Sequence, residues 1–541
     1  MTAFQTELQS VDAITQVESE LVLDDTSNSY QGVAVFDMID QMLGEYRKRE
    51  FAIMQAKEVI DEAFKFGVMS YFIDGAKLLY GSDYYCSIPR DAEAAKCCLR
   101  VEFWNRLLTA STVFEFMPAA KRKQAKQQFA GSDCPPFDES TVRPTLESLL
   151  NARSIFFAER VDGIFRGLSK QHVTNLPSGF SKKMILANVF DQFGCVNGDE
   201  AALISDLRGV VGRLTGRGEP SEYGTKKLLA RLYNKAMGKK VSIDGGAFYC
   251  TVYKRGTMHF EVAPVVAVEL NSILATLYPL AIPSRFRTRP KATQQSYFDL
   301  KTQRLPMATV DLLAAMEYKF THYVIYCYQK DESAVDAAIS VIESIGGCVS
   351  RSKDNYYLWL NFDYEVAEVI DQIVYTGVVP ETVSHQFYRT NGSIGAVAAA
   401  ELEVKPEHTC IEPQAGLGDL AQFLPIGSTV CIEIAHVRAK VLMAKGYNTV
   451  HADFLQWAKT QTMRADRILM NPPFSKGRAL AHLQAAAGLL ASAGRLVAIL
   501  PASMLNTTPL VGFKHKWSEV FVDQFEGTHV RVVILTATPD N

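Results

Sequence analysis

The stretch Ile468-Leu-Met-Asn-Pro-Pro-Phe474 decides the fold of the C-terminal third of this chain. Its apolar run is typical of a buried parallel strand, and the two prolines end that strand because they donate no ladder hydrogen bonds and fix φ. The backbone therefore leaves the sheet at Asn471, at the carboxyl edge where open α/β sheets hold ligands. There the Asn471 side-chain oxygen and the Pro472 carbonyl are two acceptors beside the flat face of Phe474. This set suits a planar group with an exocyclic amine, although Asn-Pro-Pro-Phe alone is also an ordinary turn.

Other strands in the same third end in groups that suit a nucleoside. The strand Thr409-Cys-Ile-Glu-Pro413 leads into a turn where Gly416 and Gly418 permit a tight strand-to-helix connection and close approach of backbone N–H groups to a ligand. A second strand, residues 428–434, places Glu433 to accept hydrogen bonds from ribose hydroxyls, and a third, residues 447–452, ends at Asp453-Phe454. Together these groups indicate a nucleoside-containing cofactor, and both NAD and S-adenosylmethionine (SAM) fit this half.

The alternation of strands and helices from about Thr409 onward predicts a doubly wound parallel sheet. After the Asn-Pro-Pro-Phe motif the pattern predicts a long helix over residues 479–491 and a fifth strand over residues 494–501. Residues 520–525 and 530–536 are predicted to form a terminal hairpin.

At this point the segment from about Phe387 to Thr536 resembles the SAM-dependent amino-methyltransferases, in particular the gamma-type adenine-N6 enzymes of restriction–modification systems, whose cofactor motif precedes Asn-Pro-Pro-Phe. Phe387-Tyr-Arg-Thr390 is similar to the family's Tyr-x-Thr-Pro motif, with Asn391 in place of proline. Glu412-Pro-Gln-Ala-Gly-Leu-Gly418 matches Glu-Pro-Ser-Ala-Gly-x-Gly, with Gln414 as a departure.

The resemblance implies a Rossmann-like class I methyltransferase domain and assigns roles to its residues. It implies direct transfer of the SAM methyl group to the N6 amine of adenine in duplex DNA, with the target adenine flipped out of the helix. The implied cofactor residues are Thr390, Glu412, Gly416, Gly418, Glu433, Asp453 and Phe454. The implied catalytic residues are Asn471, Pro472, Pro473 and Phe474.

The rest of the chain is expected to grip the nucleic acid, because little sequence remains in the C-terminal third for target recognition. We predict a flexible acidic tail over residues 1–32, a mainly helical nucleic-acid and target-recognition region over residues 33–283, and a basic linker over residues 284–310. A small α+β module is expected over residues 311–380 and the methyltransferase domain over residues 381–541. Within the linker, phosphate contacts are predicted for Arg285, Arg287, Arg289 and Lys291.

A second resemblance covers roughly residues 140–285. Phe165-Arg-Gly-Leu-Ser-Lys170 and Met258-His-Phe-Glu-Val262 are similar to a domain of unknown function in phage and plasmid proteins, often fused to methyltransferases. It implies a mobile-element setting and no chemistry of its own.

Bulk composition narrows the class of protein. The chain has 541 residues, 48% of them hydrophobic and 21% charged, which is ordinary for folded domains, and it lacks the run of about eighteen apolar residues that a membrane span needs. The N-terminus has no signal-peptide pattern, and ten cysteines without a C-x-x-C pair indicate reduced thiols and no metal site, so we expect a cytoplasmic protein. A net charge of −3 means that nucleic-acid binding must use local basic surface.

Three alternatives remain open at this stage. The same chemistry on RNA is the nearest, since Asn-Pro-Pro-Phe also occurs in enzymes resembling ribosomal guanine-N2 methyltransferases, which usually carry His where this chain has Ser475. Protein glutamine methylation resembles Asn-Pro-Pro-Tyr more closely. The third is a non-catalytic methyltransferase fold kept as a DNA-binding or anti-restriction module. The DNA sequence recognised, a partner nuclease and the oligomeric state do not follow from the sequence.

Overall fold

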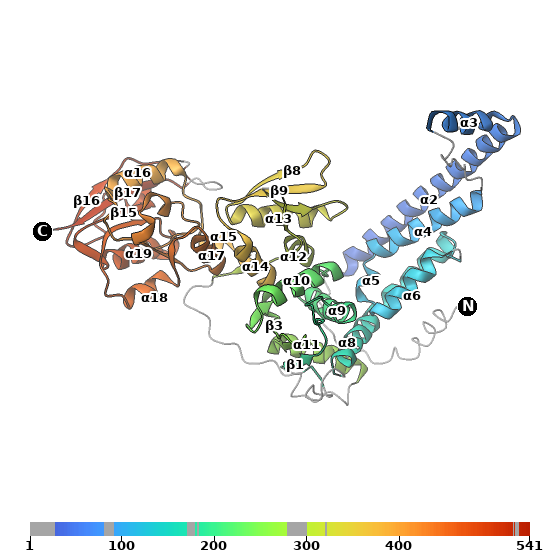
Figure 1. Ribbon diagram of the computed structural model, residues 1–541, viewed down its shortest axis with the longest axis horizontal. Coiled ribbons are helices and arrows are strands. Elements are labelled where there is room, and N and C mark those ends of the chain that lie inside the picture. The colour runs from blue at the N-terminus through green and yellow to red at the C-terminus, as the bar shows by residue number, and fades with distance from the viewer. Residues whose placement is uncertain are drawn as a thin grey trace. The chain divides into compact units, whose positions relative to one another are not determined.

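The computed structural model (Figure 1) describes residues 28–80, 91–131, 133–169, 179–180, 183–278, 300–319, 322–522, 524 and 530–540. Two compact units emerge, residues 1–167 with 270–284 and residues 168–269 with 285–541, and each is considered by itself. Most of the predicted acidic tail and the whole 285–291 window lie outside the described residues. The predicted domain boundaries therefore stay predictions.

The first unit is helical, as predicted for its part of the chain. Its helices are α2 (Asn28–Lys65), α3 (Val68–Tyr80), α4 (Ala92–Ala110), α5 (Val113–Phe116), α6 (Ala119–Ala130), α7 (Glu139–Asn151) and α8 (Arg153–Ser169). The sequence pattern predicts a single helix from Thr145 to Gly167, and this prediction is wrong, because α7 ends at Asn151 and α8 begins at Arg153. Neither Gly nor Pro marks the break at Ala152, so the sequence carries no stop signal there.

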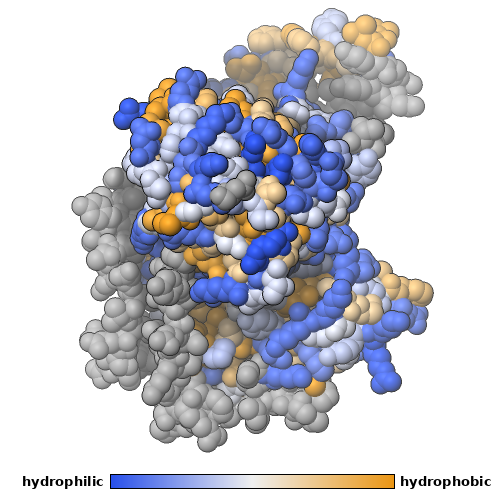
Figure 2. Space-filling model, turned by 90° about the vertical axis from the view of Figure 1, so that its left-hand side faces the viewer, coloured by the Kyte–Doolittle hydropathy of each residue, from blue (hydrophilic) through white to orange (hydrophobic). Residues whose placement is uncertain are grey.

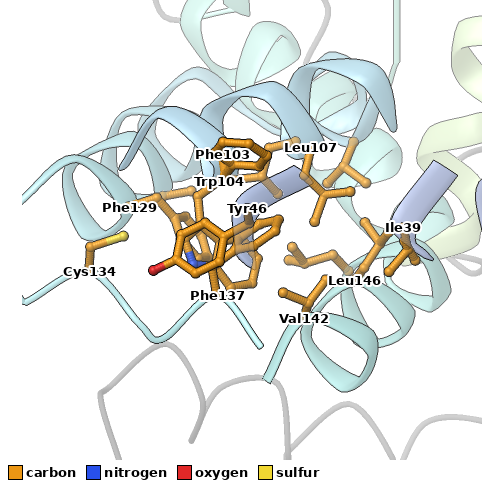
Figure 3. Close-up of a cluster of buried hydrophobic side chains, with 14 of the residues drawn as sticks. Ile39, Tyr46, Phe103, Trp104, Leu107, Phe129, Cys134, Phe137, Val142 and Leu146 are labelled. Atoms are coloured by element: carbon orange, nitrogen blue, oxygen red, sulfur yellow. The ribbon is translucent and has the colours of Figure 1, made fainter. Parts of the chain in front are cut away.

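The core of the first unit is built from aromatic side chains on several helices and the loop before α7 (Figure 3). The Trp104 ring is fully buried, and its centroid lies 4.8 Å from that of Phe129 and 5.4 Å from that of Phe137. Its indole N–H donates to the Pro135 carbonyl at 2.9 Å, so the one polar atom of the buried side chain has a hydrogen-bond partner. On α2, Ile39, Leu43 and Tyr46 face this core.

The first part of the second unit contains an antiparallel sheet with strand order β1-β4-β3-β2, so describing residues 33–283 as mainly helical is incomplete. Its elements are β1 (Lys183–Leu186), α9 (Gly198–Leu214), α10 (Glu222–Lys235), β2 (Val241–Ile243), β3 (Phe248–Val252) and β4 (Met258–Val262). Helix α11 (Pro264–Leu277) follows, and its residues from Leu270 onward belong to the first unit. The alternating pattern of residues 248–262 predicts a hairpin, which is confirmed with Phe248 opposite Val262. The sequence missed β1 and β2 because strands of three or four residues show little alternation.

A buried ion cluster joins this sheet region to the segments that follow it. Arg208 donates to both carboxylate oxygens of Asp244, at 2.7 and 2.9 Å, and both residues are at most 3% exposed. Arg217 donates to the Leu305 carbonyl at 2.7 Å. Because an unpaired buried charge is costly, these contacts hold residues 208–244 against the start of the next module.

The α+β module is confirmed as strand, helix, strand, strand, helix over residues 322–376. Its sheet is antiparallel with strand order β6-β7-β9-β8, and β5 pairs with β10 in a separate ribbon. The bounds are β5 (Thr302–Arg304), α12 (Met307–Ala314), β6 (Glu317–Lys319), β7 (His322–Tyr326), α13 (Glu332–Ser344), β8 (Cys348–Arg351), β9 (Tyr357–Asn361), α14 (Ala367–Thr376), β10 (Val378–Pro380) and α15 (Thr382–His385). Thus β5 and the start of α12 occupy part of the predicted linker.

The C-terminal part is a seven-stranded sheet of order β13-β12-β11-β14-β15-β17-β16 with helices packed against it (Figure 1). The first five strands in this order are parallel, while β17 runs antiparallel to both of its neighbours. The strands are β11 (Cys410–Glu412), β12 (Thr429–Glu433), β13 (Asn448–His451), β14 (Ala465–Met470), β15 (Leu490–Pro501), β16 (Phe513–Trp517) and β17 (Val532–Pro539). The helices are α16 (Gly392–Leu402), α17 (His436–Ala444), α18 (Phe454–Lys459) and α19 (Arg478–Ala487).

This topology confirms an α/β domain, with a mixed sheet in place of the fully parallel one predicted, and places its switch point. Strand order reverses between β11 and β14, and the crevice outside the carboxyl ends of such a pair is where open α/β sheets bind ligands. The motifs that follow β11 and β14 therefore face the same crevice. The buried strand residues Ile411, Ile468 and Leu496 form part of the hydrophobic core beneath this crevice.

Three local predictions in this part are wrong. The glycine turn leads into a 3₁₀ turn, Ala421–Phe423, and not into an α-helix, because Pro425 follows closely and disfavours helical geometry in the residue before it. Helix α19 stops at Ala487, since Leu490 already pairs with Ala465 in the sheet. The terminal hairpin is formed by β16 and β17, while among the described residues of the predicted strand 520–525 Phe521 forms an isolated bridge with Val532.

The charged residues on the edge strand β16 explain why the sequence did not predict a strand there. Lys514 and Lys516 are exposed on it, and such charged positions on an edge strand oppose pairing with another chain. They also weaken the apolar pattern by which a strand is recognised.

Figure 2, which views the left-hand side of Figure 1, shows mainly hydrophilic residues on the visible surface, with hydrophobic ones scattered among them. No helix in the described part of the chain combines the length and apolar character that crossing a bilayer requires.

Candidate active site

A cavity of about 390 Å³ lies at the switch point of the C-terminal sheet. Ten of the eleven residues predicted to act in catalysis or cofactor binding line it, and only Gly418 does not: they are Thr390, Glu412, Gly416, Glu433, Asp453, Phe454, Asn471, Pro472, Pro473 and Phe474. They come from the carboxyl ends of β11, β12 and β14, from the segments after β13 and β14, and from the segment before α16. Its volume lies within the usual range for small-molecule sites.

The Asn471 side chain is held in one orientation at the end of β14. Its Nδ2 donates to Thr390 Oγ1 at 3.1 Å, across 81 residues of sequence. Because a carboxamide is planar and its nitrogen is engaged, Oδ1 is the atom left to accept hydrogen bonds. Among the described residues, no donor contacts Oδ1 or the Pro472 carbonyl. The Thr390 hydroxyl, expected at a methionine carboxylate, thus supports Asn471 in this structure.

Glu433 joins the glycine turn to the end of β12. Its Oε2 accepts from the Gly416 N–H at 2.9 Å, and its Oε1 accepts from the Ala435 N–H at 2.8 Å and from Arg438 Nε at 3.0 Å. The carboxylate is 5% exposed. Three of its roughly four acceptor positions are therefore used within the protein, which leaves one for a ligand hydroxyl.

Glu412 and Gln414 present acceptors that lack a partner. Glu412 Oε2 and Gln414 Oε1 are buried and make no hydrogen bond to any described residue. Burial raises the pKa of Glu412 well above its usual value, and the neighbouring carboxylates Asp419 and Glu433 raise it further. A cationic ligand group at this point would relieve an unsatisfied, destabilised carboxyl group.

The wall formed by α18 and α19 is aromatic. Asp453 caps α18 by accepting from the Gln456 N–H at 3.2 Å, and Phe454 beside it is 3% exposed. The His482 ring centroid lies 5.7 Å from that of Phe454. Gln414 Nε2 and His482 Nδ1 are 2.7 Å apart. Burial lowers the pKa of His482 to about 4, so this imidazole is neutral at physiological pH.

Several cavity residues escaped the sequence analysis. Asp419 accepts from Arg389 Nη2 at 2.7 Å and from the Thr390 N–H at 3.2 Å, which fixes the segment before α16. The Arg438 guanidinium lies 4.4 Å from the Phe387 ring centroid. The Ser475 N–H donates to Gln386 Oε1 at 2.8 Å. Asp419 directly follows the Gly-Leu-Gly turn, and this adjacency was the one available signal.

The two glycines of the turn have different roles. Gly416 has φ +55°, and a Cβ built on it would lie 2.7 Å from Phe387 Cε2. Gly418 has φ +88° and faces Leu442 and Tyr447, so it permits packing within the fold. Asn391, which replaces the family's proline, caps α16 by accepting from the Ser393 N–H. Asn391 therefore preserves the start of α16 although it differs from the family's proline.

The predicted phosphate-binding residues Arg285, Arg287, Arg289 and Lys291 lie outside the described residues, so their role stays a prediction. Among the residues that are described, no group of three or more His, Cys, Asp or Glu side chains is arranged to hold a metal ion.

Comparison with known proteins links one part of the chain to a family of unknown function. Residues 98–280 match the family model described as "Domain of unknown function (DUF4942)". The match confirms that this region resembles a domain of unknown function. The matched range begins at residue 98, whereas the resemblance noted from the sequence began at about residue 140. No curated protein matches the chain.

Solved structures similar to this chain include several methyltransferases. TrmN from Thermus thermophilus is 18% identical with a TM-score of 0.23, over 27% of this chain and 48% of that one. NSun6 from Pyrococcus horikoshii with SFG is 18% identical with a TM-score of 0.23, over 27% of this chain and 52% of that one. Precorrin-6y C5,15-methyltransferase from Geobacter metallireducens is 17% identical with a TM-score of 0.22, over 27% of this chain and 87% of that one.

This chain spans about half the length of the first two of these proteins. At such identities and TM-scores the similarities do not assign an activity. The α/β fold of the C-terminal part is shown by its own strand order, and any chemistry must be argued from the residues in the cavity.

Proposed function

We propose that this protein is a SAM-dependent methyltransferase that transfers a methyl group to the exocyclic N6 amine of adenine in DNA. The observation that carries the proposal is the Asn471 carboxamide, whose Nδ2 is held by Thr390 Oγ1 so that Oδ1 and the Pro472 carbonyl are left as acceptors in a cavity at the switch point. Two acceptors side by side match the two protons of an aromatic amine.

The residues of the cavity fit SAM as the cofactor. The unpaired Glu412 Oε2 suits the ammonium group of a bound amino acid, and the remaining acceptor position of Glu433 suits a ribose hydroxyl. Asp453 and Phe454 would hold the cofactor's adenine amine and the face of its ring. The sheet also departs from the six-stranded order usual for dinucleotide binding, since antiparallel β17 lies between β15 and β16.

The protein's own contribution to the reaction is orientation and electrostatics. When bound, SAM supplies a methyl group on a sulfonium centre, which needs no further activation to leave. Asn471 Oδ1 and the Pro472 carbonyl accept hydrogen bonds from the two N–H groups of the amine. These hydrogen bonds draw the nitrogen lone pair out of conjugation with the ring. Phe474 stacks on the target base, a contact worth on the order of 1–3 kcal/mol.

A DNA substrate requires additional binding surface. Extruding a base from the duplex costs roughly a few kcal/mol, which contacts to the flanking DNA must offset. We assign this task to the residues that precede the methyltransferase domain, including the 285–291 window. Neutralisation of phosphates there makes binding weaken as salt concentration rises.

The function is tested by incubating the purified full chain with methyl-labelled SAM and, in parallel, unmethylated duplex DNA or RNA. The nucleic acid is then digested and the modified nucleoside identified by mass spectrometry. Label in N6-methyl-2′-deoxyadenosine from DNA is expected, and Asn471→Ala should reduce the rate by on the order of a hundredfold or more. Asn448→Ala, an exposed change at the start of β13 in the same sheet, is the matched control.

The RNA alternative and the non-catalytic alternative each give a different result in this assay. Label in RNA alone indicates the RNA enzyme, and label in cytosine or guanine contradicts the adenine assignment. DNA binding without SAM binding and without label indicates the non-catalytic module. Full activity in Asn471→Ala would contradict the proposed mechanism whatever the substrate.

A further inference from the structure

Helix α2 has two different faces. Ile39, Leu43 and Tyr46 are at most 5% exposed and pack into the core shown in Figure 3. On the opposite face, Phe51 and Val59 are 65% and 67% exposed. Phe66, the first residue after α2, is 74% exposed, and its N–H still donates to the Glu62 carbonyl at 2.9 Å, as in a further helical turn. Large apolar side chains gathered in this way on a surface usually mark an interaction site.

The outward face of α2 has a spacing that reads the same in both directions. Lys48, Phe51, Gln55, Val59, Glu62 and Phe66 follow one another at intervals of three, four, four, three and four residues. Adding Gly44, four residues before Lys48, makes the series symmetric about Gln55. Such intervals of three and four place all of these residues along one stripe of the helix.

The chemistry of the stripe is complementary about the same centre. Lys48 lies seven residues before Gln55 and Glu62 seven residues after it, and both are exposed. Phe51 and Val59 lie four residues on either side. Phe66 lies eleven residues after Gln55, opposite Gly44, where an added Cβ would meet no atom within 4 Å. An antiparallel copy of the stripe would therefore pair cation with anion, apolar with apolar, and a large ring with a gap.

We propose that the protein forms a homodimer in which α2 of one protomer packs antiparallel against α2 of its partner, with the two-fold axis passing at Gln55. Such a C2 interface uses the same patch on both copies. The contact from Gly44 to Phe66 runs for about 33 Å at 1.5 Å per residue. A second copy of this chain fits better than a lipid surface, because an anionic membrane would attract Lys48 and repel Glu62.

Helix α3 enlarges the apolar surface of this helical hairpin. Tyr71, Phe72, Leu78 and Leu79 are between 68% and 87% exposed. A monomer would leave all of these groups in water, at a cost that grows with their area. Dimerisation through α2 would cover the apolar residues on the outward face of that helix.

A charge-swap experiment tests the proposal. Sedimentation velocity on the full chain should show a dimer that dissociates on dilution. Lys48→Glu and Glu62→Lys should each weaken association roughly tenfold, since each creates two repulsive pairs in the dimer. The double variant with both changes should restore it. Phe51→Asp should yield monomer, whereas Phe193→Asp, at an 81% exposed position in the other unit, should not.

Crosslinking tests the register. Gln55→Cys should form an intermolecular disulfide under mild oxidation, because the two copies of this position meet at the axis. Lys48→Cys is the control, since its two copies lie about 21 Å apart along the helix. A monomeric wild-type protein, failure of the double charge variant to restore association, or preferential crosslinking through residue 48 would each overturn the proposal.

Discussion

The Gly416 N–H donates to Glu433 Oε2 at 2.9 Å and thereby joins the ends of two neighbouring strands, β11 and β12. The same carboxylate also holds the Ala435 N–H and Arg438, so the geometry of the cavity floor depends on one side chain. The candidate cofactor-binding residues Gly416 and Glu433 are in this sense positioned by each other.

Replacing Glu433 with Ala should destabilise the C-terminal sheet by about 3–5 kcal/mol, because it leaves the buried cation Arg438 without its carboxylate partner. Hydrogen–deuterium exchange measured on peptides from β11 and β12 reports this local loss in a multidomain chain. Glu407→Ala, at an exposed position, should leave exchange unchanged. Equal protection in both variants would show that Glu433 does not hold the turn.

Gly416→Ala should weaken SAM binding roughly tenfold or more. An alanine with φ +55° costs about 1–2 kcal/mol, and its Cβ would collide with the Phe387 ring that lines the cavity. Equilibrium dialysis with labelled SAM measures the effect. Gly427→Ala is the control, since no atom lies within 4 Å of its added Cβ. An unchanged dissociation constant for Gly416→Ala would mean that the turn adapts.

Thr390→Val separates two roles for the hydroxyl. If it orients Asn471, as the 3.1 Å hydrogen bond indicates, kcat should fall roughly tenfold to a hundredfold with little change in SAM affinity. If it binds the methionine carboxylate instead, SAM affinity should fall first. Thr390→Ser keeps the hydroxyl and should retain most activity in either case.

The pKa of Glu412 predicts a stability that falls with rising pH. Because burial raises its folded-state pKa well above 4.5, the native state keeps a proton that the unfolded chain has lost above that pH. Stability therefore decreases by up to about 1.4 kcal/mol per pH unit from pH 4.5 up to the folded pKa. Glu412→Gln should remove this decrease in the ligand-free protein and should gain less than wild type from added SAM. Melting temperatures between pH 5 and 8 check both points; parallel curves for the two proteins would contradict them.

His482 predicts the opposite dependence at lower pH. Burial lowers its folded-state pKa from 6.5 to about 4, so in that interval the unfolded chain binds a proton that the native state excludes. Stability should therefore be lost as pH falls from 6.5 to about 4, by at most about 1.4 kcal/mol per pH unit. His482→Gln should flatten this part of the pH–stability curve, whereas His408→Gln, at a half-buried position between α16 and β11, should not. An equally steep curve in His482→Gln would show that other groups govern acid unfolding.

The C-terminal motifs were predictable because each is a local event. Apolar strands followed by Gly, Glu or Pro-Pro end where the sequence predicts, so the succession of strands along the chain and the residues at their carboxyl ends could be inferred from the sequence. The failures are equally local in cause: Pro425 prevented a helix after the glycine turn, and the lysines of β16 hid an edge strand.

The sequence by itself determined which residues stand at the carboxyl ends of β11, β12 and β14, because periodicity and proline or glycine chemistry act over a few neighbours. Only the tertiary structure decided that Thr390 contacts Asn471, that Glu433 closes onto Gly416, and that Glu412 keeps an unpaired oxygen. These contacts join residues far apart in the chain, and their geometry depends on sheet order and side-chain packing, which no local pattern encodes.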